Sequence, residues 1–266
     1  MTGFRDLVTT FRELDLGHPC PVIVHASLSA FGRVEGGAET IVGALLYSFN
    51  AVVMPSFTYK TMIVPEVGPP NNGITYGNRD TNLMAEFYRS SMPVDRTIGV
   101  IPEALRRHPI AKRSLHPILS FVGVNAEPFL QCQTIEEPLL PIGAMMEADG
   151  WVILLGVDHR VNTSIHYGER LAGRLQFIRW ALTKGGVQEC PHYPGCSDGF
   201  ESITLKLAEI GRSVEVGGAL VRAFPLAEMV RIIREWIVSE PLALLCDRPG
   251  CERCQEVRNQ VRSMHV

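Results

Sequence analysis

A histidine and a glutamate stand three residues apart, directly after the most apolar segment of the chain. In "VNTSIHYGER", which begins at Val161, His166 and Glu169 follow the apolar run 151–157. Residues three apart on a helix share one face, so the carboxylate can hydrogen-bond the imidazole and orient it. A histidine held in this way has a defined tautomer and can act as a general base toward an amine or a hydroxyl. The same spacing also occurs in ordinary helices, where it gives only a surface pair behind a helix cap.

The segments that must position these side chains alternate between apolar runs and helical patterns. The apolar runs predict strands at 21–28, 51–59, 118–124 and 151–157. Helical patterns cover 4–14, 36–49, 100–109, 138–150, a stretch that starts near Asn162, 199–211 and 226–239. Residues 60–80 are rich in Gly, Asn and Pro and predict a loop or lid. This alternation predicts an α/β fold, with residues 1–266 forming a single layered domain in which helices flank a central mixed sheet.

Polar residues gather where two of the predicted strands end. His25, Ser27 and Ser29 lie at the end of the first strand, where it runs into a loop, and the polar segment 159–166 follows the strand at 151–157. In open α/β folds, ligands bind beyond the carboxyl ends of the strands, because helix N-termini present free N–H groups there. Either Asn162 or Thr163 can cap the helix that carries His166. The sequence therefore predicts a binding site at this edge of the sheet.

Three longer segments carry a pattern that is far more specific than the His–Glu spacing. They are "VHASLSAFGRVEGGAETIVGAL" (24–45), "IGVIPEALRRHPIAKRSLHPILSFVGV" (98–124) and "ILLGVDHRVNTSIHYGER" (153–170). Together, and in this order, they resemble the signature blocks of the antibiotic N-acetyltransferase family, whose best-known members are the aminoglycoside 3-N-acetyltransferases. The resemblance implies a fold that is not of the Gcn5-related acetyltransferase type.

The resemblance implies an acetyl-CoA-dependent N-acetyltransferase that acts on the 3-N position of the 2-deoxystreptamine ring of an aminoglycoside, or on a related amine. His166 matches the family's base, Glu169 would orient it or help to bind the amine, and Thr163 would stabilise the thioester oxygen. The residues that would face coenzyme A are His25, Ser27, Leu28, Ser29, Ser114 and His116. Without the resemblance, Ser27 is a turn former, His116 a satisfied buried histidine and Thr163 a helix cap.

A polycationic acceptor requires carboxylates around it, and the region after the second predicted strand supplies four candidates. These are Glu66, Asp80, Glu86 and Asp95. The acceptor itself stays open, because an antibiotic substrate follows from the family name as much as from any residue.

Seven cysteines, three of them close together near the C-terminus, indicate a metal site. The Cys-rich segment 246–254 supplies Cys246, Cys251 and Cys254, and we expect Cys196 to be the fourth ligand, with Cys190 and His192 as substitutes. Four thiolates close the coordination shell of tetrahedral zinc, so this zinc would be structural and not catalytic. The alternative is a set of reduced cysteines that bind no metal.

Composition and charge narrow the classes of partner. The chain is 46% hydrophobic and 20% charged, and its formal charge of −3 includes no basic block that would neutralise nucleic-acid phosphates. No apolar run reaches the roughly 18 residues of a membrane span. We therefore expect a cytoplasmic protein whose partners are acetyl-CoA and a small-molecule amine, with a homodimer as an open option.

Two other functions are weighed against acetyl transfer. A zinc-dependent hydrolase would use His25, His159 and His166 as ligands, but the chain contains no His-Glu-x-x-His spacing. A non-catalytic protein that binds coenzyme A or an aminoglycoside would need no base, whereas His166 and Glu169 are both present. Acetyl transfer is the function that the sequence favours.

Overall fold

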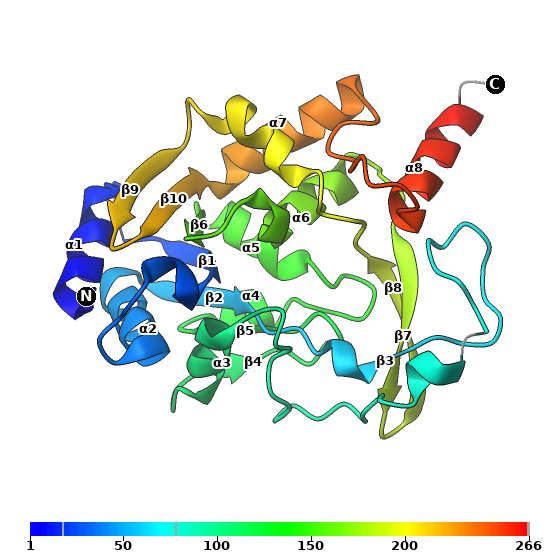
Figure 1. Ribbon diagram of the computed structural model, residues 1–266, viewed down its shortest axis with the longest axis horizontal. Helices are drawn as coiled ribbons and strands as arrows, with labels where there is room; N and C mark the ends of the chain where they lie inside the picture. Colours follow the sequence, from blue (N-terminus) through cyan, green and yellow to red (C-terminus); the bar gives the residue numbers. More distant parts are fainter. Residues whose placement is uncertain (18, 78, 265–266) are drawn as a thin grey trace.

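The computed structural model describes residues 1–17, 19–77 and 79–264. A seven-stranded mixed sheet forms the larger part of the molecule, and a three-stranded antiparallel sheet forms the smaller part. Figure 1 shows the two parts next to each other, with helix α1 (Phe4–Glu13) at one end of the molecule and helix α8 (Glu252–Ser263) at the other. The smaller sheet and α8 therefore extend the molecule on one side of the main sheet.

The larger sheet has the strand order β4-β5-β2-β1-β6-β10-β9. Its strands are β1 (Pro21–Ala26), β2 (Ala51–Pro55), β4 (Lys112–Arg113), β5 (Phe121–Val124), β6 (Trp151–Leu155), β9 (Arg212–Val216) and β10 (Ala219–Pro225). Strand β1 pairs in parallel with β2 and β6, and the remaining pairs are antiparallel. The carboxyl ends of β1 and β6 meet at one edge, where Ala26 lies opposite Leu155.

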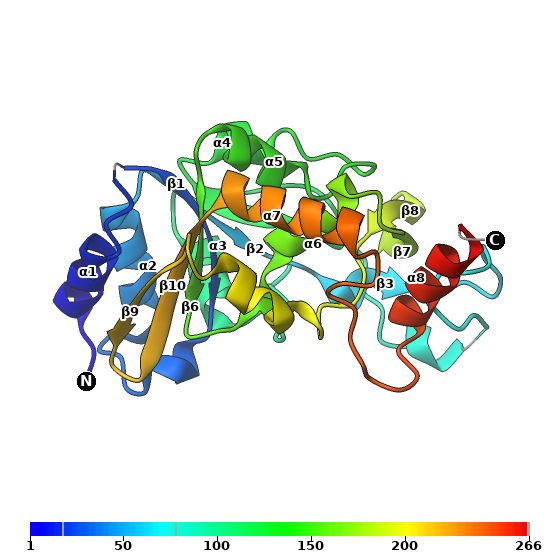
Figure 2. The same ribbon diagram turned by 90° about the horizontal axis from the view of Figure 1, so that it is seen from above.

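Helices cover both faces of this sheet, whereas α8 lies beside the smaller sheet. The helices not yet named are α2 (Gly37–Ser48), α3 (Val100–Arg107), α4 (Glu127–Leu130), α5 (Leu140–Glu147), α6 (Thr163–Leu171) and α7 (Leu226–Ser239). Successive residues of a strand face opposite sides, so Val22 and Val24 pack into the apolar cluster under α1 and α2, while Ile23 packs into the cluster under α5, α6 and α7. Figure 2 shows these two helical layers on either side of the sheet. None of the helices in the described ranges has the length and apolar character needed to cross a lipid bilayer.

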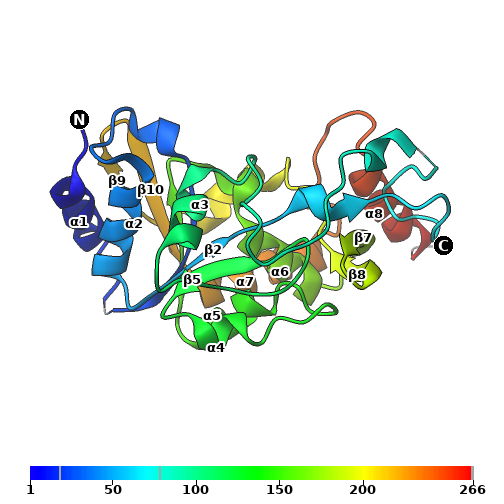
Figure 3. The same cartoon turned by 90° about the horizontal axis from the view of Figure 1, so that it is seen from below.

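The smaller sheet consists of β3 (Met62–Ile63), β7 (Phe177–Thr183) and β8 (Gly186–Tyr193). The chain reaches it directly from β2, as Figure 3 shows from below. Asn72 is tied to β7 by two hydrogen bonds with the main chain of Ile178, at 2.7 and 3.0 Å. The hydroxyl of Thr75 donates to Glu252 at 2.7 Å. These contacts hold the segment after β3 against both β7 and α8.

The predicted fold class is confirmed, because helices flank a central mixed sheet. The four predicted strands are β1, β2, β5 and β6 with shorter bounds, and α7 has the predicted bounds. The second sheet was not predicted, and β3 lies inside the segment 60–80 that was predicted to be a loop. The predicted helix at 199–211 is instead a 3₁₀ helix, η5 (Phe200–Leu207). Its buried residues Phe200 and Ile203 are three apart, which matches the period of a 3₁₀ helix.

Candidate active site

Helix α6 begins shortly after β6 ends, at the edge where β1 and β6 meet. Asn162 is its N-cap, because the side-chain Oδ1 accepts a hydrogen bond from the Ser164 N–H at 3.2 Å. Thr163 is the first helical residue and lies on the wall of a cavity. Its hydroxyl has no hydrogen-bond partner among the described residues. The cap fixes where the helix starts and thereby where His166 points, one turn later.

His166 and Glu169 form the pair that their spacing predicts. The imidazole Nδ1 lies 2.7 Å from Oε2 of Glu169, and the ring packs edge-on against Phe200 with the centroids 4.7 Å apart. Arg174 donates to the other carboxylate oxygen of Glu169 at 2.7 Å, and all three side chains are buried. A carboxylate at Nδ1 requires the proton to be on that nitrogen. Nε2 is therefore the nitrogen that can accept a proton.

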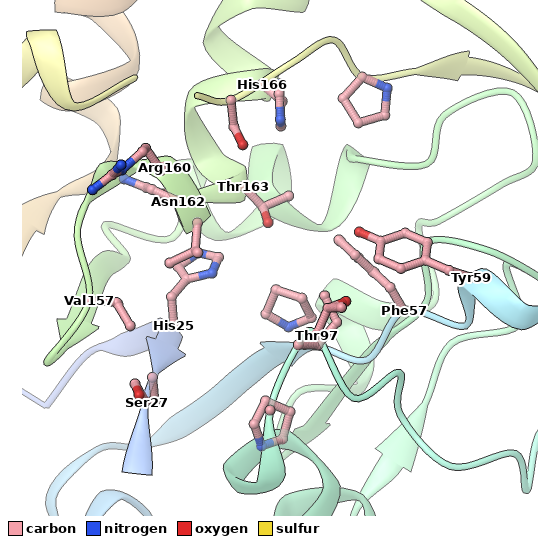
Figure 4. A pocket seen from close by; sticks show the side chains of 18 of the residues that line it. His25, Ser27, Phe57, Tyr59, Thr97, Val157, Arg160, Asn162, Thr163 and His166 are labelled. Carbon is pink, nitrogen blue, oxygen red and sulfur yellow. The ribbon is translucent and has the colours of Figure 1, made fainter. Parts of the chain in front are cut away.

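A cavity of 1180 Å³ lies beside this pair, and His166 is part of its wall. The wall is formed by the end of β1, the first turn of α6, the segment after β2 and the segment after β8. Figure 4 shows the side chains at its two ends, with His25 and Ser27 on one side and Phe57 and Tyr59 on the other. Pockets for single small ligands measure about 300–1,000 Å³, so this cavity is larger than one small ligand requires.

The four residues at the end of β1 that were predicted to face coenzyme A all line the cavity. They are His25, Ser27, Leu28 and Ser29. The hydroxyls of Ser27 and Ser29 lie 3.0 Å apart, at the start of the 3₁₀ helix η1 (Leu28–Phe31). Burial, with the nearby His159, lowers the pKa of His25 to about 3. The imidazole of His25 is therefore neutral at pH 7, and its Nε2 has no partner among the described residues.

Two arginines in the cavity wall were not predicted from the sequence. Arg160 forms an ion pair with Asp158 at 2.5 Å, whereas Arg96 forms no ion pair with a described residue. Guanidinium groups suit the phosphates of a nucleotide-like cofactor, because they donate paired hydrogen bonds. Arg96 lies outside the three segments that resemble the family, whereas Arg160 lies within 153–170. Only the fold brings both to the same cavity.

Ser114 and His116 do not line the cavity, although both were predicted to face coenzyme A. The Ser114 hydroxyl accepts the Phe121 N–H at 2.8 Å. Burial lowers the pKa of His116 to about 4, and its Nδ1 accepts the N–H groups of Ile118 and Leu119 at 3.1 and 2.9 Å. Both side chains are thus occupied in holding the turn before β5. Leu119 forms the cavity wall in this region.

The four carboxylates predicted around the acceptor do not line the cavity either. Glu66 and Asp80 are exposed, and Glu86 forms ion pairs with neighbouring basic side chains. Asp95 accepts hydrogen bonds from the N–H and the hydroxyl of Thr97, at 3.0 and 2.8 Å. The segment that carries the first three packs toward β7 and α8, which leaves these carboxylates outside the wall.

The end of the cavity away from His25 is built by residues that the sequence reasoning missed. Tyr59 and Tyr193 interact through their hydroxyls, and burial raises the pKa of both. Arg253, from the first turn of α8, donates a hydrogen bond from Nη1 to the carbonyl of Gly195 at 2.8 Å. These residues come from a turn after β2, the end of β8 and the start of α8. Their separation in the sequence explains why no motif pointed to them.

The His–Glu pair and both ends of the cavity lie largely within a segment that matches a known family. A model of that family, described as aminoglycoside 3-N-acetyltransferase, matches residues 23–238. The chain belongs to this family. The match confirms the resemblance that the three motifs indicated.

Other members of the family resemble this chain over most of its length. The SPbeta prophage-derived aminoglycoside N(3')-acetyltransferase-like protein YokD of Bacillus subtilis (strain 168) is 28% identical and is aligned over 88% of this chain and 92% of its own length. Its crystal structure superposes with a TM-score of 0.77 over 90% of this chain and 100% of that chain, at 26% identity. Aminoglycoside N(3)-acetyltransferase III of Salmonella sp is also 28% identical, over 85% of this chain and 88% of its own length. The structure called AAC-IIIb binary with CoASH is 22% identical, with a TM-score of 0.71 over 89% of this chain and 96% of that chain.

This member of the family contains a cluster of four buried thiols. Cys196, Cys246, Cys251 and Cys254 lie with their Sγ atoms within 4.8 Å of one another. None of them forms a disulfide. The two predicted substitutes lie elsewhere: the Cys190 thiol points to a carbonyl within β8, and His192 Nδ1 lies 2.5 Å from the carbonyl of Glu136.

The positions of three histidines decide whether the zinc-dependent hydrolase considered from the sequence fits the structure. Within the described ranges, the four thiols are the only group of His, Cys, Asp or Glu side chains close enough together to hold a metal ion. His25, His159 and His166 do not form a ligand set, and the Nδ1 of His166 faces a carboxylate instead. The geometry therefore gives no support to a zinc hydrolase that uses these histidines.

Proposed function

We propose that this chain is an acetyl-CoA-dependent N-acetyltransferase that moves an acetyl group to the 3-N position of an aminoglycoside or to a related amine. The observation that carries the proposal is the buried series His166–Glu169–Arg174, which ends at a cavity larger than one small ligand requires. The names of the relatives from Bacillus and Salmonella support acetyl transfer. The AAC-IIIb complex with CoASH supports coenzyme A as the acyl carrier.

His166 takes a proton from the amine as it attacks. An aliphatic amine is mostly protonated at pH 7, so it first loses one proton to the solvent and attacks the thioester as the neutral amine. As the C–N bond forms, the nitrogen becomes positively charged, and Nε2 of His166 accepts one of its remaining protons. The imidazolium that results faces the carboxylate of Glu169, and Arg174 holds that carboxylate from its other side. Glu169 is thus a positioning residue, because it acts through His166.

Thr163 stands where the thioester oxygen becomes negative. Its hydroxyl lies on the cavity wall at the N-terminus of α6, where the helix dipole also favours negative charge. When the tetrahedral intermediate collapses, the C–S bond breaks and the sulfur leaves as a thiolate. The proton held on His166 passes to that thiolate. The products are the N-acetylated amine and coenzyme A.

Coenzyme A occupies the end of the cavity formed by β1 and η1. The neutral imidazole of His25 and the hydroxyls of Ser27 and Ser29 offer hydrogen bonds there, and Arg96 and Arg160 offer positive charge to the phosphates. This arrangement puts the thioester near Thr163 and leaves the end near Tyr59 for the acceptor (Figure 4).

A thiol-release assay tests the proposed function. Purified protein is mixed with acetyl-CoA and each amine of a panel, and free coenzyme A and the N-acetyl product are measured by a thiol reagent and mass spectrometry. We expect product only with amine present and much less of it from His166→Ala. Tight binding of acetyl-CoA without turnover of any amine would instead support the non-catalytic alternative.

We also propose that the four cysteines bind one structural zinc ion. Tetrahedral zinc with Zn–S bonds of about 2.3 Å separates its sulfur atoms by about 3.8 Å. The Sγ atoms of Cys196 and Cys246 are 3.8 Å apart, and those of Cys246 and Cys254 are 3.5 Å apart. Donors typical of bound thiolates lie around them, since the Asp198 N–H is 3.5 Å from the Cys196 sulfur. With four thiolate ligands, zinc has no open position for water and contributes only to folding.

Metal analysis of protein purified without chelator tests this second proposal. We expect about one zinc per chain, and a zinc content of zero would contradict the proposal.

We also propose a cytoplasmic location, because reduced thiols and a reaction that uses acetyl-CoA are both consistent with it. A fluorescent fusion observed in intact and fractionated cells checks the location, and signal confined to an exported fraction would contradict it.

A further inference from the structure

The charges around the acceptor end of the cavity do not suit a polycation. Among the described residues that line the cavity, Asp198 is the only Asp or Glu, and it forms an ion pair with Arg248 at 3.0 Å. Four arginines line the same cavity: Arg96 and Arg160, which we assign to the phosphates of coenzyme A, and Arg248 and Arg253. Like charges repel, and an aminoglycoside with several protonated amines would find no free carboxylate in this wall.

Arg253 lies at the acceptor end of the cavity and has no acidic partner in the described part of the chain. Its Nη1 donates to the carbonyl of Gly195 at 2.8 Å, and it forms no ion pair with a described carboxylate. Arg253 lines the cavity together with Tyr59 and Tyr193, and its charge lowers the pKa of both hydroxyls against the larger effect of burial. The side chain is half-buried, so its remaining N–H groups are partly removed from water. Such a group favours a bound anion.

The fold holds Arg253 in this position. It lies between Cys251 and Cys254 at the start of α8, and those thiols belong to the buried cluster. Gly73, with φ of +53°, lies against the Arg253 side chain, where a Cβ atom would come within 2.7 Å of its Cγ. Buried Arg179 adds a second positive charge near Tyr193, over whose ring it lies at 5.1 Å. The positive charge is therefore a fixed part of this wall.

Two acids act electrostatically on this region: Asp95 contributes to the raised pKa of Tyr59, and Glu252 acts on Arg179. Oδ1 of Asp95 is engaged by the N–H and hydroxyl of Thr97, and Oε1 of the exposed Glu252 accepts the Thr75 hydroxyl at 2.7 Å. Neither acid is part of the cavity wall, and neither forms an ion pair with Arg253 in the described part of the chain.

We infer that the acceptor is an amine that also carries an anionic group, which pairs with Arg253 while the amine lies at His166. The inference rests on the proposed acetyl transfer and names the class of amine within it. A carboxylate and a phosphate monoester both have the paired oxygens that a guanidinium recognises. The amine end supplies the nucleophile, and the anionic end fixes its orientation toward the thioester.

Matched amine pairs test this inference in the thiol-release assay with the wild-type protein. Glucosamine 6-phosphate is compared with glucosamine, and β-alanine with β-alanine amide, so that each pair differs in one anionic group. Gentamicin serves as the polycationic amine. We expect kcat/KM to be higher for the anionic member of a pair, and the two pairs distinguish phosphate from carboxylate.

Arg253→Gln gives the second arm of the test, and Arg262→Gln is the matched control, because Arg262 is an exposed arginine on the same helix. Loss of a charged hydrogen bond should lower kcat/KM for the anionic amine by about 10- to 100-fold in Arg253→Gln and leave the neutral amine within about threefold. The control should change neither. An anionic preference that survives in Arg253→Gln would overturn the role of Arg253.

Different results would contradict the anionic class of acceptor and the proposed acetyl transfer. If gentamicin is acetylated with a higher kcat/KM than every anionic amine, the acceptor class is wrong and acetyl transfer stands. If no amine yields an acetylated product, the proposed function is contradicted and the inference falls with it.

Discussion

Nδ1 of His166 lies 2.7 Å from Oε2 of Glu169, and both residues come from α6, whose N-cap stands at the end of the β6 connection. This one distance links the fold to the proposed chemistry. The carboxylate fixes the tautomer, and the helix aims the second ring nitrogen at the cavity. Arg174 completes the arrangement, because it neutralises a carboxylate that is only 2% exposed.

Glu169→Gln should lower kcat less than His166→Ala does. The amide keeps the side-chain shape and can still accept a hydrogen bond from Nδ1, but it no longer stabilises the imidazolium. We expect the loss to fall on kcat with KM little changed, because the imidazolium that Glu169 stabilises forms only as the amine reacts; the same amine is used for both proteins. If Glu169 only supports the fold, kcat would fall only in proportion to the folded fraction.

A pair of glycine substitutions tests the packing that positions α6. A Cβ at Gly168 would lie 2.6 Å from Cγ2 of Ile233 in α7, so Gly168→Ala should destabilise the protein by about 1–3 kcal/mol. Gly43 lies inside α2, and its Cβ would meet only Cε2 of Phe4 at 3.8 Å. Gly43→Ala should therefore stabilise the protein by about 0.5–1 kcal/mol. Denaturant unfolding measures both, and equal effects would show that the α6–α7 contact does not set the difference.

Cys254→Ser should reduce the bound zinc and the melting temperature together. Cys254 is 1% exposed within the thiol cluster, and a hydroxyl is a poor substitute for a thiolate ligand. Cys132→Ser is the control, because Cys132 is a half-buried thiol outside the cluster. A chelator should lower the melting temperature of the wild type and of Cys132→Ser alike. Activity lost to the chelator at unchanged stability would show that the metal takes part in the chemistry.

Buried histidines should make the protein less stable as the pH falls below neutrality. Burial, followed by the charge of Arg222, lowers the pKa of His159 to about 4, against about 6.5 in the unfolded chain. Between these values the unfolded state binds more protons, so the free energy of unfolding decreases by up to about 1.4 kcal/mol per pH unit for this group. The stabilisation that comes from keeping His159 neutral is fully present above pH 6.5 and is lost as the pH falls toward 4. His159→Gln should show a shallower slope between pH 6.5 and 4, and an identical slope would exclude His159 as its source.

The sequence predicted the elements whose signal is local. Strand β6 is a continuous apolar run, α7 has a regular amphipathic period, and the spacing of His166 and Glu169 is fixed by the helix that carries them. The cysteine cluster was also predictable in part, because Cys251 and Cys254 stand close together in the chain. Its fourth member, Cys196, was a choice between two thiols that only the fold could make.

The acceptor end of the cavity could not be predicted from the sequence. Tyr59, Tyr193 and Arg253 meet because the small sheet and α8 fold against each other, and such contacts between distant segments leave no local pattern. Ser114 and His116 show the opposite case. They belong to a recognisable motif, but their side chains satisfy main-chain groups in a buried turn instead of facing the cavity.

The most direct measurement of the central claim is the steady-state rate of coenzyme A release by wild type and His166→Ala, with saturating acetyl-CoA and the best amine of the panel. General-base catalysis predicts that the variant loses about 10²- to 10⁴-fold in kcat, while the Kd for acetyl-CoA and the melting temperature stay close to those of the wild type. A variant that folds, binds acetyl-CoA and retains kcat within about threefold of the wild type would contradict the assignment of His166 as the base.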